Sequence, residues 1–347
     1  MSGARTTQRT PEKATEQGQR VPQRAPQVLD RRLALDMAQA MERCAVAAAR
    51  LRGHGDEQAA DIAAMTVCHR EVNEIPVSGT LVIGEGIEGE CDQLFVGEKL
   101  GRGGAEVDLA VDALEGTTLC AKNMEGSLCV LVLAEHDTLL KMPPCYMEKI
   151  AIGPGYPEGI VSLSQSPQDN IRALAEAKGV PPSDVTALIL DRPRHAALID
   201  AVRKTGAAIK LITDGDVAGV VHTANPHESG IDIYLGLGGS AEGVLAAAAL
   251  RCIGGQMEGR LVLDTEKKRA QAKALGITDF SKVYKLDEMV RGDCLFAATG
   301  VTDGALLKGV RFGRDVISTD TIVMRAATGT VRRIATEHRD FSKFRLA

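Results

Sequence analysis

The stretch VDLAVDALEGTTLCA, residues 107–121, changes character halfway along its length. Val107, Leu109 and Val111 alternate with Asp and Ala residues, and this period of two predicts a half-buried strand. Residues 114–118 then break the alternation and bring a glutamate, a glycine and two threonines together. Because ligand sites in α/β sheets gather at the carboxyl ends of strands, we interpret this segment as a strand that ends in a functional site.

The composition limits the classes of protein that the chain can represent. Its 347 residues, 44% of them hydrophobic, are enough to bury the core of one large domain or two ordinary ones. Aromatic residues make up only 3%, which argues against a stacking platform for single-stranded nucleic acid. The net charge of -5 gives no electrostatic reason to expect a nucleic-acid or membrane partner, and no apolar run approaches the roughly 20 residues of a membrane span.

Cysteine use and the N-terminal composition bear on the location of the protein. The 8 cysteines form no CxxC pair, and several lie inside apolar runs, so we expect buried free thiols in a reducing cytoplasm. Residues 1–29 are rich in Gln, Arg, Thr, Pro and Glu and contain no apolar signal-peptide region. This composition predicts a disordered tail.

The order of the predicted elements indicates an α/β protein whose two halves differ. Helices at 30–51 and 57–74 precede strands at 80–83, 107–112, 128–133, 138–142 and 147–152. Further on, helices at 168–178, 195–205, 216–222 and 241–252 alternate with strands at 185–190, 207–212 and 231–235. We therefore expect an α+β domain over 30–157 and a mostly parallel βαβ domain over 158–347, with the last strands placed either there or back on the first domain.

Acidic residues and glycines recur where four predicted strands end. The segments are LVIGEG (81–86), VDLAVDALEGTT (107–118), IKLITDGDVAG (209–219) and IDIYLGLGGSAEG (231–243). Glycine lets the backbone approach a ligand closely, whereas carboxylates repel a phosphate unless a metal ion lies between them. Hard oxygen ligands beside glycine turns therefore predict Mg²⁺ or Mn²⁺ next to a phosphate, in preference to solvated turns without a function.

The segment D-x-L-E-G-T, residues 112–117, resembles the D-P-[IL]-[DE]-G-T signature of the lithium-sensitive, metal-dependent phosphatases, and its Glu form is typical of class II fructose-1,6-bisphosphatases. Other segments between 33 and 338 resemble the same family: GDEQAAD (55–61), VIGEG (82–86), VGEKLG (96–101), YMEKIAIGPG (146–155), DRPRH (191–195), DGDVAG (214–219), GGSAEG (238–243) and FAATGVT (296–302). The resemblance implies a layered αβαβα sugar-phosphatase fold, a homo-oligomer, and a place in gluconeogenesis and glycerol metabolism. The implied reaction removes the 1-phosphate of a sugar bisphosphate, with fructose 1,6-bisphosphate as the first candidate and sedoheptulose 1,7-bisphosphate as the second.

The resemblance also implies the residues of the site. The family's metal ligands, for Mn²⁺ or Mg²⁺, match Asp61, Glu85, Asp112, Glu115 and Glu242. Its substrate contacts match Glu115, Gly116, Thr117, Tyr146, Arg192, Pro193, Arg194, Asp214, Gly215, Asp216 and Gly239. The chemistry agrees with these roles, because Thr117 can hydrogen-bond the attacking water, the two Arg side chains can hold the distal phosphate, and the two Asp side chains suit sugar hydroxyls. His195 follows the arginines and is a further candidate for a phosphate contact.

One loop departs from the family pattern. Residues 84–94 read GEGIEGECDQL, and Gly89 stands where the family has a catalytic Asp. Glu88 and Glu90 flank this position and are the candidates to replace it. Ala113 also replaces the Pro of the signature, which removes no ligand. The alternative to an active enzyme is therefore a slowed or non-catalytic paralogue that binds sugar phosphate as a sensor or subunit. An inositol monophosphatase is less favoured, because the Arg pair suggests a second phosphate.

Overall fold

The computed structural model describes residues 29–344 and shows a mixed α/β protein, which confirms the predicted class. Most of the predicted tail, residues 1–28, lies outside the described residues. For Leu29 the prediction was wrong, because this side chain is fully buried and its carbonyl oxygen accepts a hydrogen bond from Arg325 Nη2 at 2.6 Å. No helix of the described part is long and apolar enough to cross a membrane.

Six helices of the structure begin and end close to the positions that the sequence patterns predict, and four further helices, at 117–121, 226–229, 266–274 and 286–289, were not predicted. Within residues 29–344 the helices are α1 (Leu33–Ala49), α2 (Glu57–Asn73), α3 (Thr117–Ala121), α4 (Pro167–Lys178), α5 (Ala196–Arg203), α6 (Asp216–Val221), α7 (Pro226–Ser229), α8 (Ser240–Ile253), α9 (Glu266–Ala274) and α10 (Leu286–Met289). The start of α2 is fixed by Asp56, whose carboxylate accepts the backbone N–H of Ala59 at 2.9 Å.

The first sheet has eight strands and contains the stretch 107–115 that ends in the acidic turn. Its order is β14 (Arg311–Phe312), β15 (Ile317–Arg325), β13 (Cys294–Gly300), β6 (Leu128–Glu135), β5 (Ala105–Glu115), β1 (Val77–Ile83) and β4 (Lys99–Leu100), with β16 (Thr330–His338) paired to β15. The last strands of the chain therefore pack back on the first half. Because β1 and β5 are parallel neighbours, the residues that follow them lie at the same edge of the sheet.

The second sheet has six strands, in the order β12 (Val283–Lys285), β11 (Gln256–Val262), β7 (Tyr146–Ile152), β10 (Ile233–Gly239), β8 (Thr186–Leu190) and β9 (Ala208–Ile212). The pairs β8–β9 and β8–β10 are parallel, whereas the other three pairs are antiparallel. The prediction of a mostly parallel second half was therefore wrong. One cause is β7, which the sequence pattern groups with residues 30–157 but which pairs here between β10 and β11. The other is the antiparallel pair of β11 and β12, which were not predicted as strands. The domain division near residue 157 stays a prediction.

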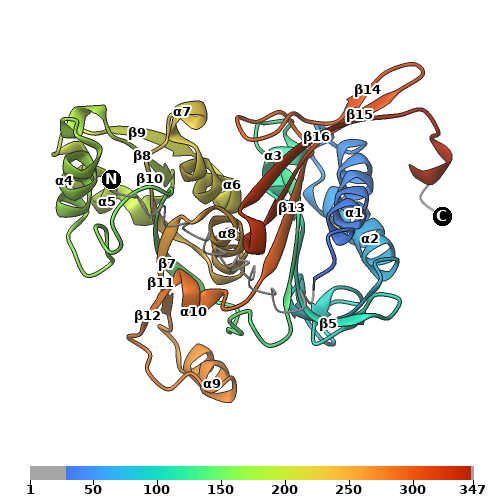
Figure 1. Ribbon diagram of the computed structural model, residues 1–347, viewed down its shortest axis with the longest axis horizontal. Helices are drawn as coiled ribbons and strands as arrows, with labels where there is room; N and C mark the ends of the chain where they lie inside the picture. Colours follow the sequence, from blue (N-terminus) through green and yellow to red (C-terminus); the bar gives the residue numbers. More distant parts are fainter. Residues whose placement is uncertain (1–28, 345–347) are drawn as a thin grey trace, which may run out of the picture.

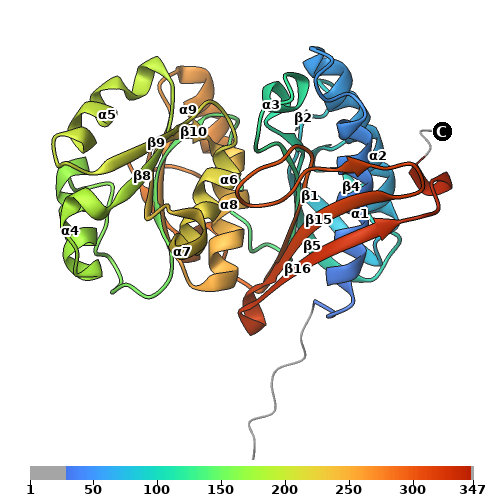
Figure 2. The ribbon, with the colours of Figure 1, turned by 90° about the horizontal axis from the view of Figure 1, so that it is seen from above.

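Helices and sheets alternate across the molecule (Figures 1 and 2). The first sheet packs against α1 and α2 on one face and against α8 on the other, while the second sheet packs against α6 and α8 on its inner face and α4 and α5 on its outer face. The central helix, SAEGVLAAAALRCI, is buried on nearly all sides, as expected for a helix between two apolar sheets. Its run of alanines lets both sheets approach it closely.

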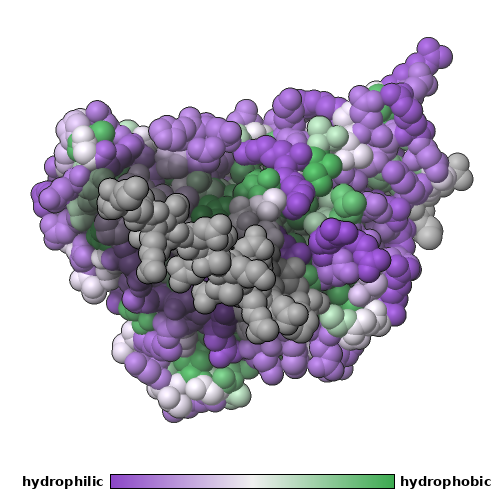
Figure 3. Space-filling view, in the orientation of Figure 1, coloured by the Kyte–Doolittle hydropathy of each residue, from purple (hydrophilic) through white to green (hydrophobic). Residues whose placement is uncertain are grey.

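The surface of one face is drawn in Figure 3, where hydrophilic side chains cover most of the outer rim. Smaller apolar areas lie between them, and scattered apolar residues of this kind are normal on a protein surface.

Residues 138–142 do not form the strand that we predicted, and only Leu139 makes an isolated bridge there. The carboxylate of Asp108 explains the difference, because it accepts the backbone N–H groups of Asp137, Thr138 and Leu139 at 3.1, 2.9 and 3.1 Å. These bonds hold the segment as a turn, and Asp137 has a positive φ of 58°.

Candidate functional site

Three carboxylates meet between the two sheets, from the end of β5 and the first turn of α8. Oxygen atoms of Asp112, Glu115 and Glu242 lie within 4.8 Å of one another. In a regular strand, residues three apart face opposite sides, but β5 carries one extra residue between Asp112, opposite Val130, and Glu115, opposite Leu128. This bulge turns both carboxylates to the same side of the sheet.

Glu85 joins this group from the end of the neighbouring strand β1. Its Oε1 accepts the backbone N–H of Ala113 at 2.7 Å. Burial, together with the nearby charges of Asp61 and Glu242, raises the pKa of Glu85 to about 7. Asp61, in the second turn of α2, is half-buried, and burial raises its pKa as well. Three of the five residues expected to bind metal thus meet in one cluster, and Glu85 lies close enough to Asp61 and Glu242 for their charges to interact.

The electrostatics of the cluster favour a cation. Burial, followed by the charges of Glu242 and Asp216, raises the pKa of Glu115 to about 8, although the backbone N–H of Val217 donates to its Oε1 at 2.8 Å. Burial and the neighbouring Glu115 raise the pKa of Asp112 well above its ordinary value. Several buried carboxylates in one place are stable only if they bind protons or a positive ion. This all-oxygen donor set fits a hard divalent cation such as Mg²⁺ or Mn²⁺.

The turn after β5 presents Thr117 directly beside these carboxylates. Gly116 has a φ of +73°, and a Cβ on this residue would lie 2.9 Å from Leu119 Cδ1. Only glycine adopts this left-handed geometry without strain. Thr117 is the first residue of α3 and is partly exposed, and only Gly116 separates it from Glu115 in the chain.

Several predicted substrate contacts gather at one end of the second sheet. Gly239, the last residue of β10, is the register partner of Tyr146, the first residue of β7. The guanidinium of Arg194 lies 4.9 Å from the centroid of the Tyr146 ring, and its Nε and Nη2 donate to the carbonyl oxygen of Leu237 at 3.1 and 2.8 Å. These contacts orient the charged fork of Arg194 and leave donors for a ligand.

The ends of β8 and β9 add the remaining predicted contacts. Arg192 is partly buried, and Pro193 opens the short 3₁₀ turn that carries Arg194. Asp214 is also partly buried, and burial raises its pKa, opposed in part by a bond to the Gly215 backbone and the charge of Arg192. Because β8 and β9 are parallel, these residues lie at the same end of the sheet.

His195 does not take the phosphate contact that we expected. Its side chain is buried, Nδ1 lies 2.7 Å from the carbonyl oxygen of Leu190, and Nε2 accepts the backbone N–H of Leu237 at 2.8 Å. Both ring nitrogens are therefore occupied, and burial lowers the pKa of the imidazole. His195 ties the end of β8 to β10 instead.

Asp216 also differs from the expectation of a sugar contact. Its carboxylate accepts hydrogen bonds from Lys149 and from the hydroxyl of Tyr234. The side chains of all three residues are almost completely buried. Sequence reasoning missed Lys149, although a single lysine inside the apolar strand YMEKIAI was a signal for a buried charge with a partner.

The divergent loop, residues 84–94, places no glutamate side chain of positions 88 or 90 in a bond with the cluster. β2 (Gly86–Ile87) pairs with β3 (Phe95–Val96) and closes the loop at its base. Glu88, Gly89 and Glu90 are exposed, and within residues 29–344 neither glutamate side chain makes a hydrogen bond or ion pair. Gly89 has a φ of +87°, and a Cβ on this residue would meet no atom within 4 Å.

Two other features do not belong to this site. A second acidic group, Asp108 with His136 and Asp137, is explained by the turn that Asp108 holds.

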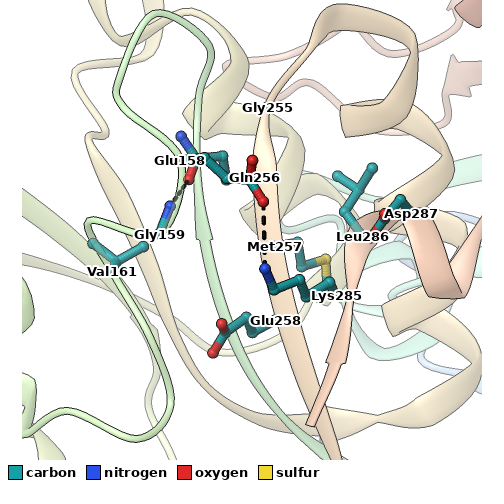
Figure 4. A pocket seen from close by; sticks show the side chains of 10 residues that line it. All are labelled: Glu158, Gly159, Val161, Gly255, Gln256, Met257, Glu258, Lys285, Leu286 and Asp287. Atoms are coloured by element: carbon teal, nitrogen blue, oxygen red, sulfur yellow. Dashed lines mark hydrogen bonds and ion pairs between the residues drawn. The ribbon is translucent and has the colours of Figure 1, made fainter.

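A cavity of about 260 Å³ lies beside β11 and β12 (Figure 4). Its polar groups pair with one another, Lys285 with Glu158 at 3.3 Å and the Gly159 N–H with Gln256 at 3.0 Å. Since β11 begins opposite Ile152, this cavity lies at the end of β7 away from Tyr146.

Comparison with known proteins identifies the class and then the family. Residues 31–338 match the family model described as bacterial fructose-1,6-bisphosphatase, glpX-encoded, so the chain is a phosphatase. The D-fructose 1,6-bisphosphatase class 2/sedoheptulose 1,7-bisphosphatase of Synechococcus sp. strain JA-3-3Ab is 40% identical over 336 residues, which cover 89% of this chain and 96% of that protein. Fructose-1,6-bisphosphatase 1 class 2 of Escherichia coli K12 is 38% identical over 323 residues, which cover 89% of this chain and 95% of that protein. The chain belongs to the glpX-type family of bacterial fructose-1,6-bisphosphatases.

Proposed function

We propose that the protein hydrolyses the 1-phosphate of fructose 1,6-bisphosphate, with Mn²⁺ or Mg²⁺ as the cofactor. The observation that carries this proposal is the buried carboxylate cluster at the end of β5, whose crowded oxygens favour a bound cation. The names of the relatives supply the substrate class, and one of them adds sedoheptulose 1,7-bisphosphate as a second substrate.

The residues that would hold the cation are Asp61, Glu85, Asp112, Glu115 and Glu242. A bound divalent cation neutralises phosphate charge and lowers the pKa of a coordinated water. The protein's own contribution is to fix the direction of these carboxylates. The bulge in β5 orients two of them, and backbone N–H groups hold Glu85 and Glu115.

The phosphate and the sugar would be bound by residues around the cluster. Thr117 hydrogen-bonds the attacking water or a phosphate oxygen, next to the backbone of Glu115 and Gly116. Arg192 and Arg194, on either side of Pro193, bind the distal phosphate. Tyr146, Asp214, Gly215 and Gly239 line the sugar, and Asp216 contributes through the shape of its turn. Glu88 or Glu90 supplies the loop carboxylate that orients the water once substrate is bound, in place of the Asp that the family has at the position of Gly89.

We also assign the alternating layers to the αβαβα sugar-phosphatase arrangement, which the position of α8 between the two sheets supports. A homo-oligomer, a cytoplasmic location, a role in gluconeogenesis and glycerol metabolism and the absence of a nucleic-acid partner stay predictions. The 8 cysteines are free thiols, as a reducing compartment would keep them.

A slowed or non-catalytic paralogue is the second candidate function. The exposed loop favours it, because within residues 29–344 the side chains of Glu88 and Glu90 make no hydrogen bond or ion pair with the cluster. Such a protein would still bind metal and sugar phosphate. The two functions differ in turnover and not in binding.

A phosphate-release assay over a panel of substrates separates these functions. The purified protein, with Mn²⁺ or Mg²⁺, would be offered fructose 1,6-bisphosphate, sedoheptulose 1,7-bisphosphate, fructose 6-phosphate and inositol 1-phosphate. We expect kcat/KM to be highest for a bisphosphate. Equal rates with the monophosphates would contradict the role of the Arg pair, and binding of a bisphosphate without release above background would establish the second candidate.

A further inference from the structure

Lys149 is a buried lysine close enough to the carboxylate cluster for its charge to act on Glu242. It lies in the middle of β7, and its side chain has an exposed fraction of 0%. Its Nζ donates hydrogen bonds to the carboxylate of Asp216 and, at 2.8 Å, to the carbonyl oxygen of Gly239. Burying an ammonium group destabilises a protein unless the group is paired and hydrogen-bonded. The buried position of Lys149 therefore depends on both acceptors.

Each acceptor of Lys149 lies at the start of a helix that orients a carboxylate of the cluster. Asp216 begins α6, and the next residue, Val217, donates its backbone N–H to Glu115 Oε1 at 2.8 Å. Gly239 directly precedes α8, whose first turn carries Glu242. Lys149 therefore joins the two backbone segments on which the positions of Glu115 and Glu242 depend.

The surroundings leave room for this lysine and for little else. A Cβ on Gly238 would collide with the Asp216 carboxylate and lie 3.1 Å from Lys149 Nζ. A Cβ on Gly243 would lie 3.3 Å from Lys149 Cδ. On its other side, Asp216 accepts the hydroxyl of Tyr234. Both oxygens of Asp216 are thus engaged, and its carboxylate is held in one orientation.

We propose that Lys149 is a positioning residue of the metal centre, which holds Glu115 and Glu242 at the separation at which they share one divalent cation. It acts through Asp216 and the Gly239 carbonyl and does not itself touch the cation or the substrate. The inference rests on the proposed function, because that function assigns Glu115 and Glu242 as metal ligands.

A purely electrostatic role for Lys149 predicts the opposite effect on metal binding. A positive charge behind the cluster repels a divalent cation, so its removal would strengthen binding if charge alone mattered. If position matters more, its removal lets the starts of α6 and α8 separate and weakens binding. Residues that orient metal ligands typically change affinity by about 10- to 100-fold when they are replaced.

The test measures Mn²⁺ binding to the full chain without substrate, from the electron paramagnetic resonance signal of free Mn²⁺. We expect Lys149→Met to raise the Kd for Mn²⁺ by about 10- to 100-fold. Asp216→Asn keeps the lysine and removes its charged partner, so it should weaken binding in the same direction and remains informative if Lys149→Met does not fold. The double variant should lose less Mn²⁺ binding free energy than the two single variants together, because both substitutions break the same contact between Lys149 and Asp216.

Lys178→Met is the matched control. Lys178 pairs with the buried Asp232 at 2.7 Å, and Asp232 also accepts the backbone N–H of Thr186 at the start of β8, far along that strand from Arg192. This variant also removes the lysine of an ion pair with a buried carboxylate, although Lys178 has an exposed fraction of 30%, and it should melt at a lower temperature with an unchanged Kd for Mn²⁺.

The outcomes separate this inference from the proposed function. Unchanged or tighter Mn²⁺ binding by folded Lys149→Met and by Asp216→Asn would overturn the positioning role, while phosphatase activity of the wild type would still support the proposed function. Equal weakening in Lys178→Met would also overturn the positioning role, because the effect would then reflect general stability. A wild-type chain that binds no Mn²⁺ would overturn both.

Discussion

The backbone N–H of Ala113 donates a hydrogen bond to Glu85 Oε1 at 2.7 Å, across the ends of two neighbouring parallel strands. Ala113 lies in the bulge of β5, which frees its N–H from the ladder with β6. The bond favours the charged form of Glu85 and so opposes the effect of burial on its pKa. Ala113 stands where the family signature has Pro, and in this chain it thus supplies a backbone hydrogen-bond donor to Glu85.

Ala113→Pro should shift the pH dependence of metal binding. Proline has no N–H, so Glu85 loses a hydrogen bond to its charged form and its pKa rises above about 7. We expect Mn²⁺ binding at pH 7 to weaken roughly tenfold, the size of one lost bond to a charged group, and to recover at pH 8.5. Mn²⁺ titrations at both pH values check this. Ala113→Gly, which keeps the N–H, is the control, and an equal loss at both pH values would contradict the explanation.

The metal-free protein should become less stable as the pH rises. Glu115 has a folded pKa of about 8, above its ordinary value of 4.5, so its protonated form is favoured in the folded state. The corresponding stability is present below pH 4.5 and is lost as the pH rises through about 8. In metal-free protein, Glu115→Gln should therefore reduce the fall in Tm between pH 5.5 and 8.5. If the variant had the same Tm profile as the wild type, the pKa of Glu115 would not be raised in the folded protein.

The sequence predicted the members of the carboxylate cluster but not the residues that support it. Asp112 and Glu115 were visible because a polar segment ends an apolar strand, and the structure brings them to Glu242. The course of β7 could not be predicted, since an apolar strand carries no mark of the sheet that it joins. The role of Lys149 could not be predicted either, because its partner Asp216 is 67 residues away in the chain.

Local polar contacts explain the remaining differences. His195 follows two arginines, which suggested a phosphate contact, but burial between Leu190 and Leu237 decides its role. Asp108 lies in a strand, yet its carboxylate binds a distant backbone segment and turns residues 138–142 away from strand geometry. Side chains that bond to backbone groups far along the chain leave no pattern in a local window of sequence.

Arg194→Ala should mainly raise KM for the bisphosphate. Its fork is oriented by Leu237 and Tyr146, and we assign it to the distal phosphate, away from the reacting bond. Loss of a charge-assisted contact of about 1.5–3 kcal/mol corresponds to a roughly 10- to 150-fold higher KM, with a smaller change in kcat. Steady-state kinetics measure both. Arg203→Ala, which removes an exposed arginine at the end of α5, should change neither, and an unchanged KM in Arg194→Ala would show that Arg194 does not bind the substrate.

Glu88→Gln or Glu90→Gln should lower kcat at saturating Mn²⁺. General-base assistance contributes typically about 10²- to 10⁴-fold and acts in the transition state, so the Kd for Mn²⁺ should stay the same. Gly89→Asp tests the alternative, with Gly89→Ala as the control for strain at its φ of +87°. If Gly89→Asp raised kcat and neither glutamine variant lowered it, the loop would have lost its catalytic carboxylate, as the slowed-paralogue hypothesis requires.

The most direct test of the proposed function follows fructose 1,6-bisphosphate by phosphorus NMR after incubation with the purified protein, with and without Mn²⁺. The metal ion is removed on a chelating resin before each spectrum, because paramagnetic Mn²⁺ broadens phosphorus signals. We expect the 1-phosphate signal to disappear, and fructose 6-phosphate and inorganic phosphate to form in equal amounts, only when Mn²⁺ is present. Asp112→Ala, which removes a carboxylate of the cluster, should abolish this turnover and weaken Mn²⁺ binding. Loss of the 6-phosphate, turnover without a divalent cation, or near-normal turnover by Asp112→Ala would contradict a metal-dependent 1-phosphatase.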